Sequence, residues 1–190
     1  MMTTDKSLTT SEVATLRSLI GQTIVAFEAS PLSSGTDYEN VKVDTDETSI
    51  MVSNSFDLVD VGYERGRGEE EVGTMRVEIC TGPLVLEDVV SGPENAIVPI
   101  GLKVTGVEVV NDTIEMLRDG EITNSFKFTQ AVIFHMEKGD FVVERNVWFE
   151  VFVDAYITKD GRRSLRDTSA DWGDDGSDYE GVVKREFVTL

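Results

Sequence analysis

Cysteine, histidine and basic residues are all scarce in this chain of 190 residues. A single cysteine excludes an internal disulfide, and with a single histidine it also excludes a zinc site built from these two residue types. Lysine and arginine number 17 against 36 aspartate and glutamate residues, which gives a formal net charge of -19. Such a chain is repelled by the phosphates of nucleic acids and by anionic membrane surfaces. We therefore expect neither a nucleic acid nor a membrane as a partner.

Long apolar runs and the apolar core of a secretory signal are also missing from the sequence. The lone cysteine favours a reducing compartment, and we expect a cytoplasmic protein. The hydrophobic fraction of 40%, which includes 9 phenylalanines, is too high for a disordered acidic tail. We expect residues 1–190 to fold as a single domain.

One short helix is predicted near the N-terminus, followed by strands. Thr9 and Glu12 have the spacing of a capping box, and the apolar residues after them, such as Leu16, follow helical spacing. The helix is predicted over about residues 10–20, with Gly21 at its end. Beyond it, Val, Ile, Phe and Thr recur in short alternating runs, which indicates a mainly β fold.

An internal repeat is predicted from two similar segments, because residues 20–28 align with residues 100–108 and similar runs follow both in the same order. We expect two similar antiparallel β-units, about 20–63 and 100–156, packed as a sandwich or barrel-like body. A C-terminal loop and strand would follow over 157–190. The alternative is that β-rich sequences reuse Val, Ile and Gly by chance.

Glycines mark the predicted hairpin turns. Gly139 supplies the positive φ that the turn at 137–140 needs, and Asp119 with Gly120 forms a second hairpin signal. Residues 112–118 fit a short capped helix equally well.

Negative charge is concentrated in two segments, with a net charge of -8 over residues 37–71 and -6 over residues 167–180. Charge concentrated in this way steers a basic partner and raises its association rate. Solubility alone is the alternative explanation. The predicted partner-binding acids are Asp44, Asp46, Glu47, Glu69, Glu70, Glu71, Asp171, Asp174, Asp175, Asp178 and Glu180. A local basic patch lies nearby, at Lys159, Arg162, Arg163 and Arg166.

A long alternating strand is predicted over residues 147–157, with one apolar face in the core. The other face alternates aromatic and acidic side chains, which suit stacking and hydrogen bonding to a small ligand or carbohydrate. Coverage of this face by other strands is the alternative. The candidate ligand-binding residues are Trp148, Glu150, Phe152, Asp154 and Tyr156.

No catalytic signature emerges from the sequence. His135 and Glu137 share a strand face and could act as an acid–base pair, but a half-exposed strand position beside a hairpin turn is the favoured interpretation. The glycines of residues 62–68 match no phosphate loop, and the acidic residues 171–180 depart from the calcium-loop pattern. We expect no catalytic residues, no metal and no cofactor.

The predicted function is that of a non-enzymatic acidic interaction protein that binds a basic protein partner. As a class, such proteins resemble the immunity proteins that neutralise bacterial toxins, or adaptors, although no motif carries this resemblance. The first alternative is a small-ligand or carbohydrate binding module. The second is a metal-dependent hydrolase built from carboxylates alone. The sequence indicates no oligomeric state.

Overall fold

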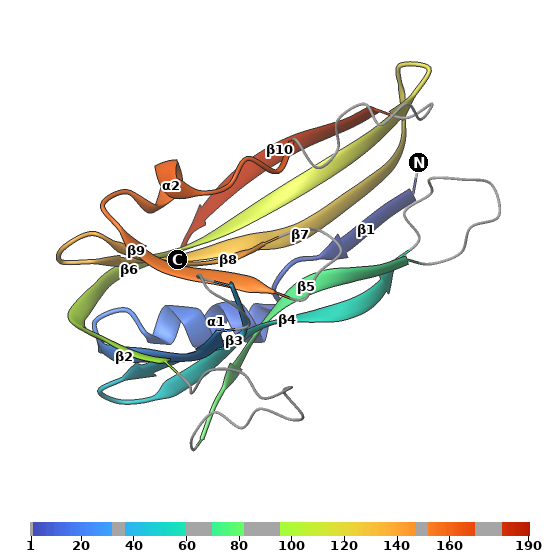
Figure 1. Cartoon of the computed structure of the whole chain (residues 1–190). Coiled ribbons are helices and arrows are strands. Elements are labelled where there is room, and N and C mark those ends of the chain that lie inside the picture. Colours follow the sequence, from blue (N-terminus) through green and yellow to red (C-terminus); the bar gives the residue numbers. More distant parts are fainter. Residues whose placement is uncertain (1, 32–36, 60–69, 82–95, 147–151, 170–179) are drawn as a thin grey trace.

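The computed structural model describes residues 2–31, 37–59, 70–81, 96–146, 152–169 and 180–190 (Figure 1). The prediction of a mainly β fold with a short N-terminal helix is confirmed. The elements in these ranges are, in chain order, β1 (Met2–Lys6), α1 (Thr10–Ser18), β2 (Thr23–Pro31), β3 (Asp37–Thr45), β4 (Ser49–Val59), β5 (Glu70–Ile79), β6 (Ala96–Arg118), β7 (Glu121–Met136), β8 (Asp140–Arg145), β9 (Val153–Thr158), α2 (Gly161–Ser164) and β10 (Glu180–Thr189).

The strands form one sheet, antiparallel throughout except where β1 pairs in parallel with β7. The main order is β1-β7-β8-β9-β3-β2-β6-β10, and β4 and β5 continue from β3 as a side branch. The long β6 pairs with β2 over its first part and with β7 over its second, so it joins two regions of the sheet. Within the described residues β1, β5 and β10 remain edge strands. The predicted sandwich or barrel-like body is not confirmed.

The internal repeat is not confirmed either. The two proposed units contain β2–β3–β4 and β6–β7–β8, each a run of consecutive antiparallel strands. Their strand lengths differ widely, however, since β2 has 9 residues and β6 has 23. The first strands also pair with each other, with Thr23 opposite Lys103.

Helix α1 begins with the predicted capping box. Thr9 Oγ1 accepts a hydrogen bond from the Glu12 N–H at 3.3 Å, and Glu12 Oε2 accepts one from the Thr9 N–H at 2.7 Å. The second oxygen of Glu12 accepts a bond from the Val77 N–H of β5 at 3.0 Å. Leu16 and Leu19 are fully buried, and the helix runs between the lower strands, β2 to β5, and the upper strands, β7 to β9 (Figure 1). The helix therefore docks on the edge of β5 through its own cap.

Both predicted hairpin turns form. Gly139 has a φ of 80°, while Asp119 and Gly120 have φ values of 53° and 78°. The alternative of a helix over residues 112–118 is wrong, because these residues continue β6 and pair with β7 and β10.

In the described part of the chain, the buried side chains form three clusters. The largest lies around Phe27, Phe134 and Phe141, whose rings stack at centroid distances of 5.0 and 5.7 Å. A second cluster, around Phe126 and Phe128, lies at the other end of β7. The third occupies the opposite face of β7 and β8 and includes Ile133, Val142 and the partly buried Leu165 of the segment after α2. Strands β7 and β8 are therefore buried on both faces, each large side chain contributing about 1.5–3 kcal/mol.

Candidate functional site

The first group of predicted acids lies at the turn between β3 and β4. The Asp44 carboxylate lies 2.9 Å from the Lys42 ammonium and accepts a bond from the Ser49 hydroxyl at 2.5 Å. Asp46 accepts a bond from the Thr23 N–H at 2.8 Å, and Glu47 is exposed. Two of these acids therefore help to hold the turn, while Glu47 extends into solvent.

Glu71 lies far from that turn, because it pairs with Leu58 near the opposite end of β4. The nine residue steps along β4 from Ser49 to Leu58 span roughly 30 Å of extended chain. The first acidic segment is therefore not one patch. Glu70, the first residue of β5, pairs with Val59, and Glu180 begins β10 beside Leu117. Five other predicted acids lie outside the described residues: Glu69, Asp171, Asp174, Asp175 and Asp178.

The aromatic and acidic strand face is described only in part, since Trp148 and Glu150 lie outside the described residues. In β9, Val153 and Ala155 are buried as predicted, whereas Ile157, expected on the same buried face, is 48% exposed. Phe152, Asp154 and Tyr156 are half-buried.

The phenol of Tyr156 is engaged within the chain. Its hydroxyl donates to Glu144 Oε1 at 2.6 Å and lies 3.2 Å from the Ser164 carbonyl oxygen. Burial raises the pKa of Glu144, although bonds from Tyr156 and the Arg166 N–H oppose this effect. Burial and Glu144 together raise the pKa of Tyr156. Tyr156 therefore anchors the α2 segment to the sheet.

Two carboxylate–arginine clamps act at β6: one fastens the segment of residues 158–169 to it, and the other joins it to the neighbouring strand β10. The Arg162 guanidinium makes two hydrogen bonds to the buried Glu108, one of them at 2.8 Å, and lies over the Phe187 ring at 4.7 Å. Arg185 binds both oxygens of the fully buried Asp112 at 2.7 Å, and the Thr168 hydroxyl donates to the same carboxylate at 2.8 Å.

Some side chains of the basic patch seen in the sequence therefore bind groups within the chain and do not face solvent freely. Arg162 holds Glu108, whereas Arg163 is exposed and lies 3.9 Å from Asp160. The Arg166 N–H donates to Glu144 at 3.1 Å, and its guanidinium donates to the Asn146 carbonyl oxygen.

His135 lies between two carboxylates. Its Nδ1 is 2.8 Å from Asp140 Oδ1, and its Nε2 is 3.3 Å from Glu108 Oε2. Asp140 also accepts a hydrogen bond from the Gly161 N–H at 2.6 Å. A Cβ atom at position 161 would lie only 2.7 Å from the Ile133 side chain. Both ring nitrogens therefore face carboxylates that also bind the α2 segment. Glu137, the partner that strand alternation suggested, is exposed at the turn.

The Arg162 guanidinium and the Thr189 hydroxyl, which donates to Glu108 at 3.1 Å, lower the pKa of Glu108 to about 2. Glu108 is therefore an ionised anchor at neutral pH. Among the residues that the structure describes, no group of three or more His, Cys, Asp or Glu side chains is placed to hold a metal ion.

The hairpin of β4 and β5 carries a surface that sequence reasoning missed. At the start of β4, Ile50 and Val52 face the main core. At its far end the buried face changes: Asp57 and Val59, which lie on the other face of the strand, point towards the second cluster. Phe56 and Leu58 therefore face outward, with exposures of 48% and 57%. The alternation in the sequence places Phe56 and Leu58 on the same strand face as the buried Ile50 and Val52, so it carried no signal that the buried face changes along β4.

No protein family model, no curated protein and no solved structure matches this chain. In the part of the chain that the structure describes, no helix has the length and apolar character needed to cross a membrane.

Proposed function

We propose that this chain is a non-enzymatic acidic interaction protein that binds a basic protein partner. The observation that carries the proposal is how the charges are distributed. Basic side chains that form ion pairs inside the chain include Lys6, Lys42, Arg76, Lys127, Arg162, Arg163, Lys184 and Arg185. Exposed carboxylates include those of Glu47, Glu78, Glu121, Glu137 and Glu180. The described part of the chain therefore presents carboxylates to solvent, where they attract cationic surfaces.

The exposed face of the β4–β5 hairpin supplies an apolar anchor for such a partner. Phe56 and Leu58 lie two residues apart on one strand face, and Glu71 is the cross-strand neighbour of Leu58. Exposed apolar side chains beside a charged one fit the apolar centre and polar rim of protein interfaces, where phenylalanine is enriched. We propose that this hairpin face, defined by Phe56, Leu58 and Glu71, contacts the partner.

An affinity experiment tests the proposal. The full chain is immobilised and exposed to native lysate at about 20 mM and about 300 mM NaCl, since salt screens exposed charges. We expect a protein of high isoelectric point to be retained at low salt and released at high salt. The retained protein is then titrated against the chain by calorimetry, where we expect a 1:1 complex.

Two matched variants locate the surface. Leu58→Ser removes an anchor of the hairpin face, whereas Ile157→Ser removes a similarly exposed apolar side chain on β9. We expect Leu58→Ser to weaken the complex about tenfold or more and Ile157→Ser to leave it unchanged. Retention of no basic protein at low salt would count against the function. Equal effects of the two variants would count against the hairpin face.

A further inference from the structure

Strand β10 is a long, regular edge of the sheet. Within the described residues it pairs with β6 alone, over all 10 of its residues and without a register shift. The other two edges offer less to a further strand, because β1 has only 5 residues and the Val77 N–H of β5 already donates to Glu12. Proline and bulges, which commonly block an edge, are both missing from β10. In Figure 1 it forms the upper edge of the sheet, away from the β4–β5 hairpin.

Half of the backbone groups of β10 point away from β6. The Leu190 N–H, one residue beyond the strand, donates to the Val107 carbonyl oxygen at 3.0 Å. Because alternate residues of an antiparallel pair bond to the neighbouring strand, the even-numbered residues of β10 bond to β6. The N–H and C=O groups that point outward therefore belong to Gly181, Val183, Arg185, Phe187 and Thr189.

The sequence of β10 is complementary to itself when two copies run antiparallel about an axis through Arg185. Lys184 then lies opposite Glu186 of the second copy, and Val183 lies opposite its Phe187. Pairs of opposite charge, and pairs of an aromatic with a β-branched residue, are both favourable across strands. Moving the axis by one residue would place either two Lys184 or two Glu186 side chains opposite each other. Charge therefore selects this register.

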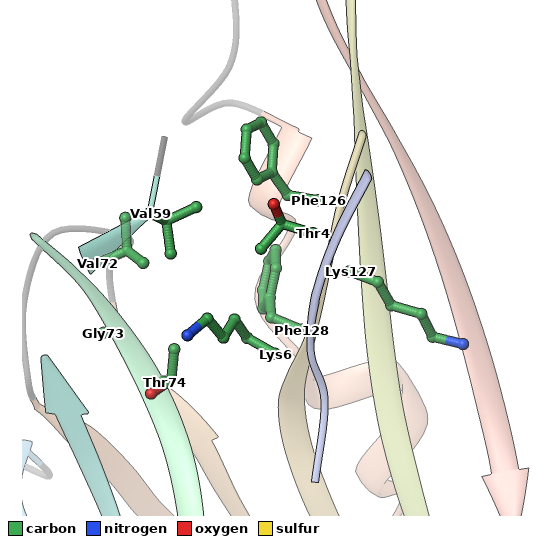
Figure 2. Close-up of a pocket in the computed structure, with 9 residues that line it drawn as sticks. All are labelled: Thr4, Lys6, Val59, Val72, Gly73, Thr74, Phe126, Lys127 and Phe128. Atoms are coloured by element: carbon green, nitrogen blue, oxygen red, sulfur yellow. The ribbon is translucent and has the colours of Figure 1, made fainter. Parts of the chain in front are cut away.

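The side chains of Lys184 and Glu186 are each 60% exposed and already belong to ion pairs on the strand face. Lys184 lies 2.6 Å from Glu115, and Glu186 lies 2.9 Å from Lys127. Figure 2 shows the Lys127 side chain pointing away from the hollow beside β1. Across the axis, these pairs would join into a row of alternating charge. An ammonium has three donors and a carboxylate accepts several bonds, so every group keeps its present partner.

The charges on β10 also balance, which removes the repulsion expected between two copies of an acidic chain. Glu180 and Glu186 are offset by Lys184 and Arg185. The two Arg185 side chains would meet at the axis, but each binds both oxygens of its own fully buried Asp112 at 2.7 Å. The edge is therefore close to neutral in a chain with a net charge of -19.

We propose that two copies of this chain form a dimer through β10, paired antiparallel about a two-fold axis at Arg185. The outward-facing residues would exchange about ten backbone hydrogen bonds, and the two sheets would become continuous. An interface made by one strand edge is small. We therefore expect a reversible dimer with a dissociation constant of about 10–100 μM.

The test is sedimentation equilibrium of the purified full chain, from about 1 μM to about 500 μM. Lys184→Glu and Glu186→Lys each place like charges opposite one another, at exposed positions that the fold tolerates. We expect each variant alone to dimerise about tenfold more weakly than wild type, or worse. An equimolar mixture of the two should associate like wild type, because every acidic position of one chain then faces a basic position of the other.

Lys103→Glu is the matched control. It makes the same change in charge at an exposed residue of β6 that pairs with β2, away from β10. We expect this variant to dimerise like wild type.

Hydrogen exchange followed by NMR tests the geometry of the pairing. The amides of Val183 and Phe187 should exchange more slowly at high concentration, because they bond only in the dimer. Those of Lys184 and Glu186, which bond to β6, should be protected equally at all concentrations.

Four results would overturn the proposal. The first is a folded wild-type chain that stays monomeric at every concentration. The second is a mixture of the two variants that associates no better than either alone. The third is an equal loss for Lys103→Glu, which would show a general effect of charge. The fourth is protection of Val183 and Phe187 at every concentration, which would show that the chain itself covers this edge. No basic protein takes part in these measurements, so this proposal and the proposed function can fail independently.

Discussion

At the scale of single residues, the fold uses scarce cations to neutralise buried carboxylates. Glu108 and Asp112 are almost completely buried on β6, and a buried carboxylate without a partner would cost several kcal/mol. Arg162 and Arg185 supply those partners from outside β6. One member of the basic patch in the sequence, Arg162, is therefore a structural clamp.

Glu108→Gln should change how stability depends on pH. The folded pKa of about 2 lies below the ordinary value of 4.5, so ionised Glu108 stabilises the fold. That contribution is complete above pH 4.5 and is lost as the pH falls towards 2. We expect Glu108→Gln to lower the free energy of unfolding at neutral pH, and its difference from wild type to shrink below pH 4.5. Urea unfolding of both proteins, from neutral pH to below pH 4.5, measures this difference in the free energy of unfolding.

Glu186→Gln is the control for this series, because Glu186 forms an exposed pair with Lys127. An exposed pair contributes at most about 1 kcal/mol. A difference between wild type and Glu108→Gln that stays constant down to pH 2.5 would contradict the assignment of the low pKa to Glu108.

At the scale of elements, Glu12 links the start of α1 to the edge of β5. Glu12→Ala removes the acceptors for both the Thr9 and the Val77 N–H groups, which should cost about 1–3 kcal/mol of unfolding free energy. Glu12→Gln keeps one acceptor oxygen and should cost less. Denaturant unfolding gives the costs, and hydrogen exchange should show lower protection of the Val77 amide. Glu78→Ala, on the same strand and exposed, is the control. Equal costs for Glu12→Ala and Glu12→Gln, with unchanged Val77 exchange, would contradict this linkage.

What the sequence could predict at this scale was local. The cap at Thr9 and the glycine turns depend on neighbours a few residues away, and both were predicted correctly. The change of buried face along β4 depends on β1 and β7, which approach it only in the folded chain, so no pattern within β4 indicates it. Strand β1, short and polar, also forms through its pairing with β7.

The similarity behind the predicted repeat has a simpler structural counterpart. Gly21 and Gly101 both adopt positive φ, at 95° and 67°. Gly21 precedes β2 and Gly101 lies within β6, and these two strands pair with each other. The Gly21 N–H donates a hydrogen bond to the Val104 carbonyl oxygen at 2.9 Å. Two partner strands that bend at the same level need glycine and β-branched residues in similar places. Likeness of this kind therefore does not require a duplication.

At the scale of the whole molecule, the charge of -19 acts on folding and on binding in opposite ways. Mutual repulsion of exposed carboxylates opposes the compact state, while the same carboxylates attract a basic partner. Ion pairs with a buried member, such as Asp112 with Arg185, are screened much less by salt than exposed charges are.

Salt should therefore stabilise the chain and weaken the proposed complex. When NaCl is raised from about 0.01 M to about 0.15 M, the screening length falls from about 30 Å to about 8 Å, which removes most of the repulsion between distant carboxylates. We expect the melting temperature of the chain alone to rise by a few degrees, while the affinity for the basic partner falls. Differential scanning calorimetry and titration calorimetry in the same buffers measure the two effects. Glucose at equal osmolality is the control, since it does not screen charge. A melting temperature that falls with salt would mean that local ion pairs, and not the surplus of negative charge, dominate the electrostatics of the fold.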